Sequence, residues 1–506
     1  MSSKPSIPKG TRDFSPTEMV RRNYIFETIK KVYRRYGFQQ IETPAMENLS
    51  TLIGTGGEES DTLIFKILDS GDYTRKIDWN LFINKANELG YGKPIGNTID
   101  IIPTEISNKI IEELGTFEFT KKISSKALRY DLTVPFARYV VQNQNDITFP
   151  FRRFQIQPVW RADRPQKGRY REFYQCDADI IGSDSLLNEV DLIKIIDDVF
   201  SELFRGKLNY TVSINNRKIL QGIVESVGEQ DKFEQIVVAI DKYDKIGFDA
   251  VNKELGNIGL SDKSVNAISR LTYANDMMKM FEKGVPDSLF LSKNELKELE
   301  FNIKELQLNY DDDSLIKKGI DELEFIFEKL EIIGINPGSI KFDPTLARGL
   351  GYYTGTIIEV KVDNFPSICG GGRYDDLTGK FGLKGVSGVG ISFGADRIYD
   401  VLLDNDLYPE FKEDSTQVLF INFGEKEEEY CLPLLFQLRG AGINAEIYPE
   451  AVKMKKQMNF ANNKGIKYVV LVGSDEMKSG KLTVKNMESG NQESLTINEL
   501  INLVKS

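Results

Sequence analysis

A dense basic segment lies between two runs of residues whose pattern predicts strands. The runs cover 153–160 and 173–181, and Gly168 permits a tight turn between them. A guanidinium group binds phosphate oxygens through a two-pronged fork and keeps its charge, so such a hairpin can hold a polyphosphate or an RNA end. A solvated basic hairpin without a ligand is the alternative. The basic residues are Arg161, Arg164, Lys167, Arg169 and Arg171.

Acidic and amide side chains recur along the second of these strands. Gln175, Asp177 and Asp179 are spaced two residues apart, which directs all three to one face. Asp131 and Thr133 lie in another run that we expect to be extended. Carboxylates on a covered sheet face are costly unless a cation or donor meets them. An amino-acid ammonium or a protonatable ring would do so, and structural pairing with nearby arginines is the alternative.

Three further segments combine glycine with arginine or tyrosine. Residues 346–355 carry an arginine and two tyrosines between glycines, and residues 369–374 read Cys-Gly-Gly-Gly-Arg-Tyr. Residues 388–397 predict a strand that passes into a helix with Arg397 in its first turn. Glycine lets a backbone approach a ligand closely, and a helix N-terminus beside an arginine suits an anion. A plain hairpin and a packed strand–helix corner are the alternatives for the last two.

The composition excludes whole classes of mechanism. The chain has 506 residues and no histidine, whereas about ten would follow from average usage. Ser-His-Asp and Cys-His nucleophiles, histidine metal sites and an imidazole general base are therefore excluded. The three cysteines lie far apart, so we expect a reducing compartment and no structural metal. With a net charge of −11, any nucleic-acid contact must use local basic patches.

Nothing in the sequence predicts export or insertion into a membrane. The first ten residues are polar and contain proline, without the apolar core of a secretory signal. No apolar run approaches the roughly 20 residues that span a bilayer. We therefore expect a cytoplasmic protein with no membrane partner.

Periodicity along the chain predicts the elements that position these residues. Up to residue 397 we expect, in order, a helix over 19–36, a strand over 38–43, an insertion over 70–122, a helix over 188–204, a strand over 209–214, a helical insertion over 216–336 and glycine-rich strands over 341–397. From residue 416, strands over 418–423 and 468–472 alternate with helices over 425–439 and 452–463, which predicts a compact α/β domain.

Taken together, these segments resemble class II aminoacyl-tRNA synthetases, and within them the histidyl-tRNA synthetase family. The resemblance implies an α+β catalytic domain, an antiparallel sheet flanked by helices, over 1–405 with the insertions 70–122 and 216–336. An α/β anticodon-binding domain over 416–506 follows. The matching segments are the N-terminal 8–14, motif 1 at 37–44, motif 2 at 154–182, motif 3 at 388–397, and the histidyl signatures 128–135 and 348–355.

The resemblance implies a ligase that activates L-histidine with ATP, releases pyrophosphate and transfers histidine to the 3′ end of its tRNA. Mg²⁺ would accompany the ATP phosphates, and motif 1 would form a homodimer. A chain without histidine can perform this chemistry, because nucleotidyl transfer depends mainly on positioning and charge neutralisation, which arginine and Mg²⁺ supply.

The resemblance also implies a role for each matched residue. Arg161 and Arg348 would be catalytic, Arg161 at the substrate carboxylate and α-phosphate, and Arg348 on the charge that develops at the α-phosphate. Histidine would be bound by Asp131, Leu132, Thr133, Arg161, Gln175, Asp179, Arg348, Tyr352 and Tyr353, with Asp131, Thr133 and Gln175 at the ammonium and Asp179 and Tyr353 at the ring nitrogens. ATP would be bound by Arg161, Asp163, Arg169, Phe173 and Arg397, with Phe173 on adenine. The tRNA acceptor end would meet Arg164, Gln166 and Lys167.

The chain departs from the family pattern at several positions. Gly351 stands where an acidic residue is usual, and Asp163 and Asp131 stand where many relatives carry glutamate. The usual histidines of motif 2 are replaced by Ala162 and Tyr174. One hypothesis for the absence of histidine is that such an enzyme can still be translated during histidine starvation, and compositional drift is the alternative.

Two other functions compete with this interpretation. A regulatory subunit of the first enzyme of histidine biosynthesis resembles these synthetases, but generally lacks the C-terminal domain and parts of the arginine signatures. Here 416–506 is present, with a basic region suited to RNA phosphate. A class II enzyme for another amino acid, such as proline, is opposed by Asp131, Asp179 and the Tyr352-Tyr353 pair. The basic region consists of Lys453, Lys455, Lys456, Lys464 and Lys467.

Overall fold

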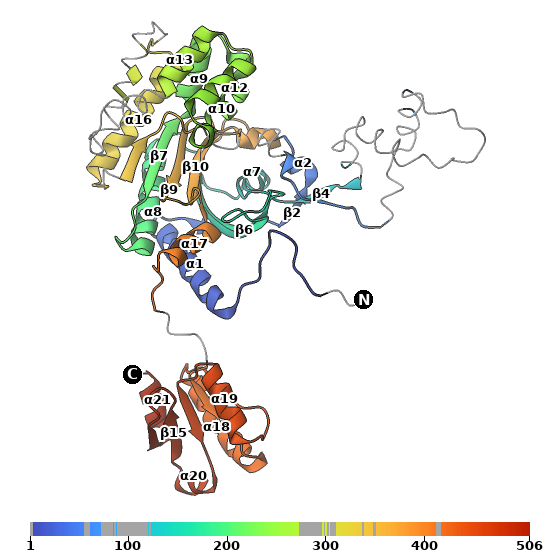
Figure 1. Ribbon diagram of the computed structural model, residues 1–506, viewed down its shortest axis with the longest axis vertical. Coiled ribbons are helices and arrows are strands. Elements are labelled where there is room, and N and C mark those ends of the chain that lie inside the picture. Colours follow the sequence, from blue (N-terminus) through green and yellow to red (C-terminus); the bar gives the residue numbers. More distant parts are fainter. Residues whose placement is uncertain are drawn as a thin grey trace, which may run out of the picture. The chain divides into compact units, whose positions relative to one another are not determined.

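The computed structural model describes most of the chain as two compact units, Met1–Tyr408 and Pro409–Ser506 (Figure 1). The predicted insertion 70–122 lies almost entirely outside the described residues. These are 4–54, 61–71, 84, 88, 120, 123–272, 296–297, 299–300, 303, 310–335, 339–347, 351–410 and 416–505.

An eight-stranded sheet organises the first unit, in the order β1-β5-β6-β11-β10-β9-β7-β8. The inner six strands are antiparallel, as expected, whereas the outer strands β1 and β8 run parallel to their neighbours. The predicted α+β class is confirmed. The strands are β1 Gln39–Gln40, β5 Phe151–Trp160, β6 Glu172–Ile181, β7 Thr211–Asn216, β8 Ile340–Phe342, β9 Thr356–Lys361, β10 Cys369–Asp375 and β11 Ser387–Gly394.

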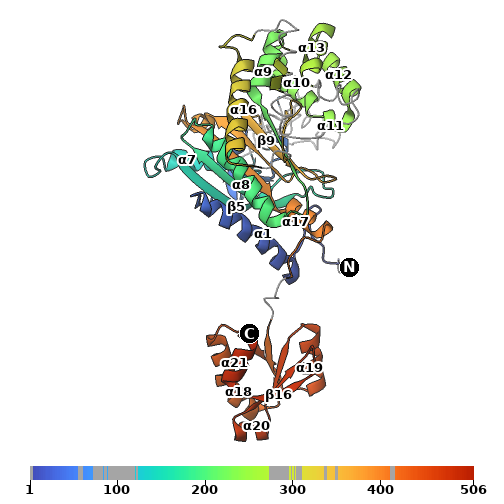
Figure 2. The same ribbon diagram turned by 90° about the vertical axis from the view of Figure 1, so that its left-hand side faces the viewer.

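Helices α1 and α8 lie side by side over one face of this sheet (Figure 2). Along β5 and β6 the side chains alternate, so that Phe154 and Ala178 join the main apolar core with these helices. Arg153 and Asp179, each one position away, belong to the opposite, polar face. The helices of the unit outside the helical module are α1 Pro16–Arg35, α2 Leu49–Leu52, α7 Thr133–Gln142, α8 Leu187–Phe204 and α17 Ala395–Asp404, with a 3₁₀ turn at Leu377–Phe381.

Helix α1 begins three residues earlier than its periodicity predicted. Ser15 and Glu18 form a capping box, in which the Glu18 carboxylate accepts the Ser15 backbone N–H at 2.7 Å. Pro16 occupies the first helical position, where its missing N–H costs nothing. These terminal signals, rather than the apolar repeat, set the start of the helix.

Two other predictions about local structure were wrong. The strand over 38–43 is only two residues long, as β1, and beyond it the Thr43 N–H donates to the Gln157 side chain at 3.1 Å. The segment with Asp131 and Thr133 is not extended. Thr133 begins α7, and the Asp131 carboxylate accepts the Val134 N–H at 3.3 Å, as a capping side chain does.

The described part of the predicted insertion 216–336 is helical. Its helices gather beyond one end of β7, β9 and β10 (Figure 1). Leu296, Leu299 and Ile303, three of the apolar residues spaced as on a helix face, are buried in the main core. The helices are α9 Arg217–Ser226, α10 Phe233–Ile240, α11 Tyr243–Ile246, α12 Phe248–Asn257, α13 Asp262–Thr272 and α16 Leu315–Ile332, with a 3₁₀ turn at Gln230–Lys232.

A three-stranded sheet, β2-β4-β3, lies beside α2 and α7 in the first unit. Its strands are β2 Met46–Asn48, β3 Lys66–Ile67 and β4 Lys126–Leu128. Strand β4 leads directly into the segment that carries Asp131.

The second unit is the expected α/β domain. Its sheet has the order β13-β12-β14-β15-β16, with the first three strands parallel and the last two antiparallel. Among the described residues, no helix of either unit is long and apolar enough to cross a bilayer. The elements are β12 Val418–Phe420, α18 Glu425–Gly440, β13 Ala445–Ile447, α19 Met454–Asn463, β14 Tyr468–Leu471, α20 Ser474–Ser479, β15 Leu482–Asn486, β16 Gln492–Leu495 and α21 Ile497–Lys505.

Candidate active site

The polar face of the central sheet gathers most of the acidic and amide residues that the sequence singled out. Strand register sets which side chains are neighbours, because directly paired residues point to the same face. Across β5, β6 and β11 the paired sets on this face are Arg153, Asp179 and Gly390; Gln155, Asp177 and Ser392; and Gln157, Gln175 and Gly394. Residues from three separate stretches of chain therefore form one surface.

Asp179 is buried and held from two sides. The Arg153 Nη2 lies 2.7 Å from its carboxylate, and the Tyr374 hydroxyl donates to it at 2.6 Å. Burial raises the pKa of Asp179, and the charge of Arg153 opposes that rise. A Cβ at Gly390 would overlap the carboxylate oxygen, so only glycine leaves room for this arrangement. Asp179 is thus fixed in orientation by its surroundings.

Asp177 lies beside Asp179 and is equally buried. Burial raises its pKa to about 7, against the lowering effect of Arg153. In the described part of the chain its Oδ1 meets no hydrogen-bond partner, and neither does the Oε1 of Gln175. Native proteins rarely leave such buried atoms unpaired. A ligand with N–H donors would satisfy both oxygens.

Asp131 reaches the same cluster from the segment before α7. The Tyr352 hydroxyl donates to its carboxylate at 3.4 Å, and burial raises the pKa of Asp131 to about 6, opposed by Arg161. Tyr352 packs edge-on against Tyr353 and Tyr374, with ring centres 5.0 and 6.0 Å apart. Since Tyr374 binds Asp179, these aromatic rings join the two carboxylates into one cluster.

The remaining predicted histidine-binding residues lie around this cluster. Leu132 is buried, and its carbonyl accepts from Arg153 Nη2 at 3.5 Å. Thr133 is half-buried at the start of α7. Tyr353 sits against Gly372 in β10, where a Cβ would lie 2.9 Å from its ring. The glycine-rich segment 369–374 is therefore a central strand and not a hairpin turn.

Arg161 connects the amino-acid cluster to the basic loop. Its Nε donates to the Tyr130 carbonyl at 2.9 Å, next to Asp131. Its guanidinium carbon lies 5.3 Å from the centre of the Phe173 ring. One side chain thus bridges the proposed histidine-binding and ATP-binding residues.

The basic loop is a hairpin connection, as predicted, and most of its polar groups are engaged. Arg169 pairs with the buried Asp163 at 2.6 Å, and Arg171 Nε donates to the Asp163 carbonyl at 3.0 Å. Arg397, in the first turn of α17, donates from Nε to the Gly168 carbonyl at 2.9 Å. Arg397 and Arg169 therefore approach the same turn from different parts of the chain.

Helix α17 also holds this hairpin through three carboxylates one turn apart. Asp396 accepts the Tyr174 backbone N–H at 2.9 Å, and Asp400 accepts the Tyr170 hydroxyl at 2.9 Å. Asp404 pairs with Lys167 at 2.8 Å on the surface. Arg12, from the N-terminal segment, inserts here, with its Nη2 2.9 Å from Asp396 and its guanidinium 4.4 Å from the Tyr170 ring centre.

Arg348 lies outside the described residues. Three further residues that the sequence singled out are described but are not brought into the polar cluster. Arg164 and Gln166 are exposed on the loop, and Gly351 is exposed before β9. The sequence predicted the correct face for Asp177 but no role for it, and it predicted no role for Arg153. Pairing the two predicted strands with each other could have indicated the roles of both residues, because that pairing sets Arg153 opposite Asp179.

Comparisons with known proteins identify the family. A model described as "Histidyl-tRNA synthetase" matches residues 10–76 and 111–398, and one described as "Anticodon binding domain" matches residues 417–506. The chain belongs to the histidyl-tRNA synthetase family. This family catalyses the histidylation of tRNA, so the chain is an aminoacyl-tRNA ligase.

Curated relatives of the histidyl-tRNA synthetase family match the whole chain. A protein named "Histidine--tRNA ligase" from Bacteroides fragilis (strain YCH46) is 52% identical over 504 residues, covering 99% of each chain. One of the same name from Porphyromonas gingivalis is 50% identical and covers 97% of each. Among solved structures, the histidyl-tRNA synthetase from Nostoc sp. PCC 7120 matches with a TM-score of 0.71 at 27% identity, covering 100% of this chain and 99% of that one.

Proposed function

We propose that this chain activates L-histidine with ATP on the polar face of its central sheet and then transfers the histidyl group to the 3′ end of its tRNA. One observation carries the assignment to this face: buried, unpartnered carboxylate and amide oxygens lie beside a loop of arginines. The first set suits a zwitterion with ring nitrogens, and the second suits a polyphosphate.

The histidine subsite would use the carboxylates in different ways. Asp131, Thr133 and Gln175 would receive the α-ammonium, with Leu132 as a wall. Asp179, kept in place by Arg153, would accept from one ring nitrogen, and Tyr353 would bond the other. Burial raises the pKa of Tyr353, so its hydroxyl stays protonated and can donate. Imidazole needs partners on opposite edges, which this pair supplies.

The ATP subsite would lie along the hairpin. Phe173 would stack on adenine, with Asp163 nearby, and Arg169 and Arg397 would hold the outer phosphates. Arg161 lies between Phe173 and the Asp131 segment, where the substrate carboxylate and α-phosphate must meet. Together with Arg348 it would neutralise the charge that develops as the carboxylate attacks phosphorus.

Mg²⁺ enters this proposal together with the ATP phosphates. Asp163, the carboxylate within the loop, already pairs with Arg169 at 2.6 Å. When bound with ATP, Mg²⁺ would neutralise charge on the phosphates, and Asp163 would remain paired with Arg169.

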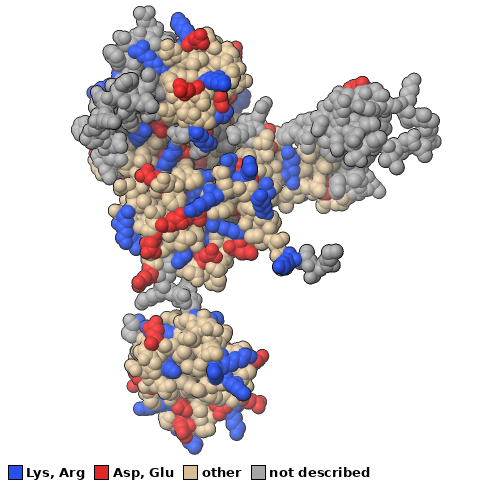
Figure 3. Space-filling view, viewed as in Figure 1, with Lys and Arg blue, Asp and Glu red and all other residues tan. Residues whose placement is uncertain are grey.

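The tRNA would contact both units. Arg164, Gln166 and Lys167 would meet the acceptor end, and the exposed Lys167–Asp404 pair is weak enough for RNA phosphate to displace. In the second unit Lys453, Lys455 and Lys456 are exposed at the start of α19. On the face seen in Figure 3, basic side chains lie among acidic ones, so recognition would rest on such local patches.

The proposal also covers the domain boundaries and the oligomeric state. The catalytic domain would cover 1–405, with insertions 70–122 and 216–336, and the anticodon-binding domain 416–506. Motif 1 at 37–44 would form the interface of a cytoplasmic homodimer.

A charging assay with each of the standard amino acids tests this function. The purified chain, ATP, Mg²⁺ and a histidine tRNA transcript should form aminoacyl-tRNA with histidine alone. Charging with another amino acid at a comparable kcat/KM, or none with histidine, contradicts the proposal.

A further inference from the structure

The N-terminal segment, residues 8–14, packs against the basic hairpin on both sides of its turn. The Gly10 carbonyl accepts the Arg171 backbone N–H at 2.8 Å. A Cβ at Gly10 would lie 2.8 Å from the Pro165 ring and 2.9 Å from the Arg171 side chain. The φ of Gly10 is +90°, a conformation that residues with a side chain rarely adopt. The close approach therefore requires glycine, and it places Arg12 beside the hairpin.

Arg12 extends from this segment to the groups that hold the hairpin. Its Nη2 lies 2.9 Å from Asp396, and its Nη1 donates to the Tyr170 hydroxyl at 3.2 Å and lies 3.5 Å from Asp400. Its guanidinium carbon lies 4.4 Å from the centre of the Tyr170 ring and 5.5 Å from that of Tyr399. One planar group therefore contacts two carboxylates and a hydroxyl, which suits the rigid fork of arginine better than a lysine ammonium.

Two partners of Arg12 adjoin residues that the proposed function assigns to ATP. Tyr170 directly follows one of them in the hairpin, and Asp396 directly precedes another in α17. Asp396 also accepts the Tyr174 backbone N–H at 2.9 Å, one residue beyond the proposed adenine-stacking ring. The contacts of Arg12 therefore bear on the backbone beside all three ATP residues. These are Arg169, Arg397 and Phe173.

Asp396 also pairs with a second arginine. Arg22, from α1, lies beside the same carboxylate oxygen, and its side chain is 4% exposed. The Arg22 guanidinium carbon lies 3.8 Å from the centre of the Phe14 ring. Removing Arg12 would thus leave Asp396 with a buried cationic partner, so no unpaired buried charge would result. Such a change should affect the hairpin more than the stability of the whole unit.

We infer that Arg12 is a positioning residue for the ATP subsite, because it holds the hairpin against α17 through Asp396 and Tyr170. The inference rests on the proposed function, which assigns the adenine and the outer phosphates to the hairpin and α17. Without Arg12, a smaller fraction of the molecules would have the hairpin in place, and the apparent affinity for ATP falls with that fraction. The histidine subsite lies on the polar face of the sheet and does not depend on this contact.

The first test compares KM for the two substrates in histidine-dependent pyrophosphate exchange. Arg12→Gln should raise KM for ATP by about tenfold, the scale of one hydrogen bond to a charged group, and KM for histidine by less than about twofold. Arg12→Lys keeps the charge beside Asp396 but not the fork, so its KM for ATP should lie between those of the wild type and Arg12→Gln.

Arg152→Gln is the matched control. The Arg152 side chain is 31% exposed, against 26% for Arg12, and it pairs with Asp191 at 2.8 Å. Its guanidinium carbon also lies 5.7 Å from an aromatic ring centre, that of Phe38, at the end of β5 far from the hairpin turn. Both KM values of Arg152→Gln should equal those of the wild type.

A double variant tests whether Arg12 acts through Tyr170. Combining Arg12→Gln with Tyr170→Phe should raise KM for ATP by less than the product of the two single effects, because both changes break the same contact. A product of the two effects would contradict the inference.

A further measurement needs no substrate. Trypsin should cleave native Arg12→Gln after Lys167 several-fold faster than it cleaves the native wild type or Arg152→Gln, because the hairpin is held less firmly. Unchanged cleavage, an unchanged KM for ATP, or an equal rise in KM for ATP and for histidine would each overturn the inference. Absence of histidine-dependent exchange in the wild-type chain would instead overturn the proposed function.

Discussion

Arg153 and Asp179 form an ion pair of 2.7 Å on adjacent strands, with both side chains buried in the central sheet. The same guanidinium acts on the neighbouring Asp177, whose pKa burial raises to about 7. One cation thus faces two buried carboxylates, and the substrate subsite depends on it for both charge and geometry.

Removing that cation should destabilise the fold as well as substrate binding. Arg153→Met leaves two carboxylates without their buried partner, so we expect about 3–5 kcal/mol less unfolding free energy in urea titrations. The adjacent Arg152 pairs with Asp191 on the surface at 2.8 Å, and Arg152→Met should cost less than about 1 kcal/mol. Equal losses from the two variants would show that the buried pair has no special role.

The Asp131 carboxylate should lower the stability of the folded chain while it strengthens the binding of histidine. Its folded pKa of about 6 lies above the ordinary value of 3.8 because of burial, so its ionised form destabilises the folded chain above about pH 6. Asp131→Asn should raise the unfolding free energy at pH 8 by about 1–3 kcal/mol. That gain should fade as pH falls through about 6 and be lost below 3.8, where the carboxyl is protonated in both the folded and the unfolded state.

The same variant should bind histidine poorly at pH 8, because the carboxamide lacks the charge that attracts the ammonium. We expect KM for histidine to rise at least tenfold, or about 1.4 kcal/mol. Pyrophosphate exchange measures it. A variant that is more stable with unchanged KM would remove Asp131 from the subsite.

Gly390 should tolerate no side chain. A Cβ there overlaps the Asp179 carboxylate, so Gly390→Ala must displace the group that faces the ring. We expect kcat/KM for histidine to fall by about a hundredfold, because a displaced Asp179 would no longer hold the substrate in its reactive position. Gly256→Ala, in α12 with open space around it, is the control, and it should leave kcat/KM unchanged while stabilising the helix by up to about 1 kcal/mol.

Tyr170 should act as a positioning residue for the ATP loop. Its hydroxyl donates to Asp400 at 2.9 Å, and burial beside that carboxylate raises the pKa of Tyr170 to about 12. Tyr170→Phe removes this hydrogen bond and the one that the hydroxyl accepts from Arg12 Nη1 at 3.2 Å, and a hydrogen bond to a charged group is worth about 1.5–3 kcal/mol. KM for ATP in exchange should rise several-fold while KM for histidine stays constant. A change confined to histidine would contradict this role.

The sequence predicted the hairpin of β5 and β6 and helix α8 well because their alternation and periodicity continue through ten or more residues. Prediction failed where a single side chain diverts the backbone. The Thr43 N–H donates to the Gln157 side chain instead of continuing a strand, and the Asp131 carboxylate accepts the Val134 N–H in the first turn of the helix that Thr133 begins.

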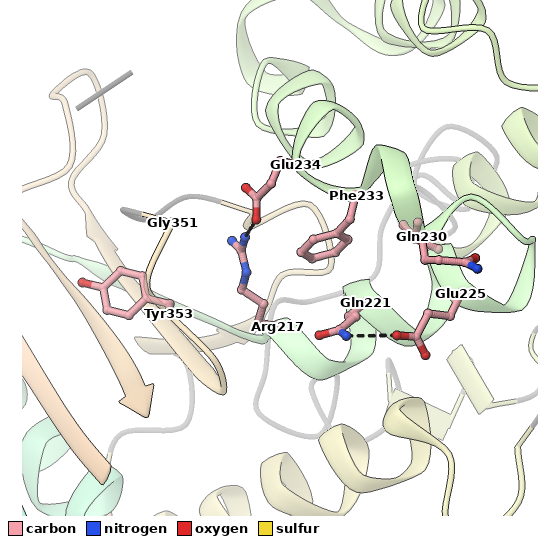
Figure 4. A pocket seen from close by; sticks show the side chains of 9 residues that line it. Arg217, Gln221, Glu225, Gln230, Phe233, Glu234, Gly351 and Tyr353 are labelled. Carbon is pink, nitrogen blue, oxygen red and sulfur yellow. Dashed lines mark hydrogen bonds and ion pairs between the residues drawn. The ribbon is translucent and has the colours of Figure 1, made fainter. Parts of the chain in front are cut away.

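The site was predictable as a set of residues, but the pairings within it were not. Alternation placed Gln175, Asp177 and Asp179 on one face. The ion pair of Arg153 with Asp179 depends on the register between β5 and β6. The hydrogen bond of Tyr374 to Asp179 depends on β6 and β10 lying on either side of β11. A cavity of about 280 Å³ beside Phe233 lies between the helical module and the segment before β9, and no local pattern reveals it (Figure 4).

The most direct test of the central claim is amino-acid-dependent pyrophosphate exchange by the wild-type chain and by Asp179→Asn. We predict exchange with histidine alone, and a fall in kcat/KM for histidine of about a hundredfold in the variant, with KM for ATP unchanged. Exchange by the variant at the wild-type rate, or wild-type exchange that other amino acids support equally, would contradict the account.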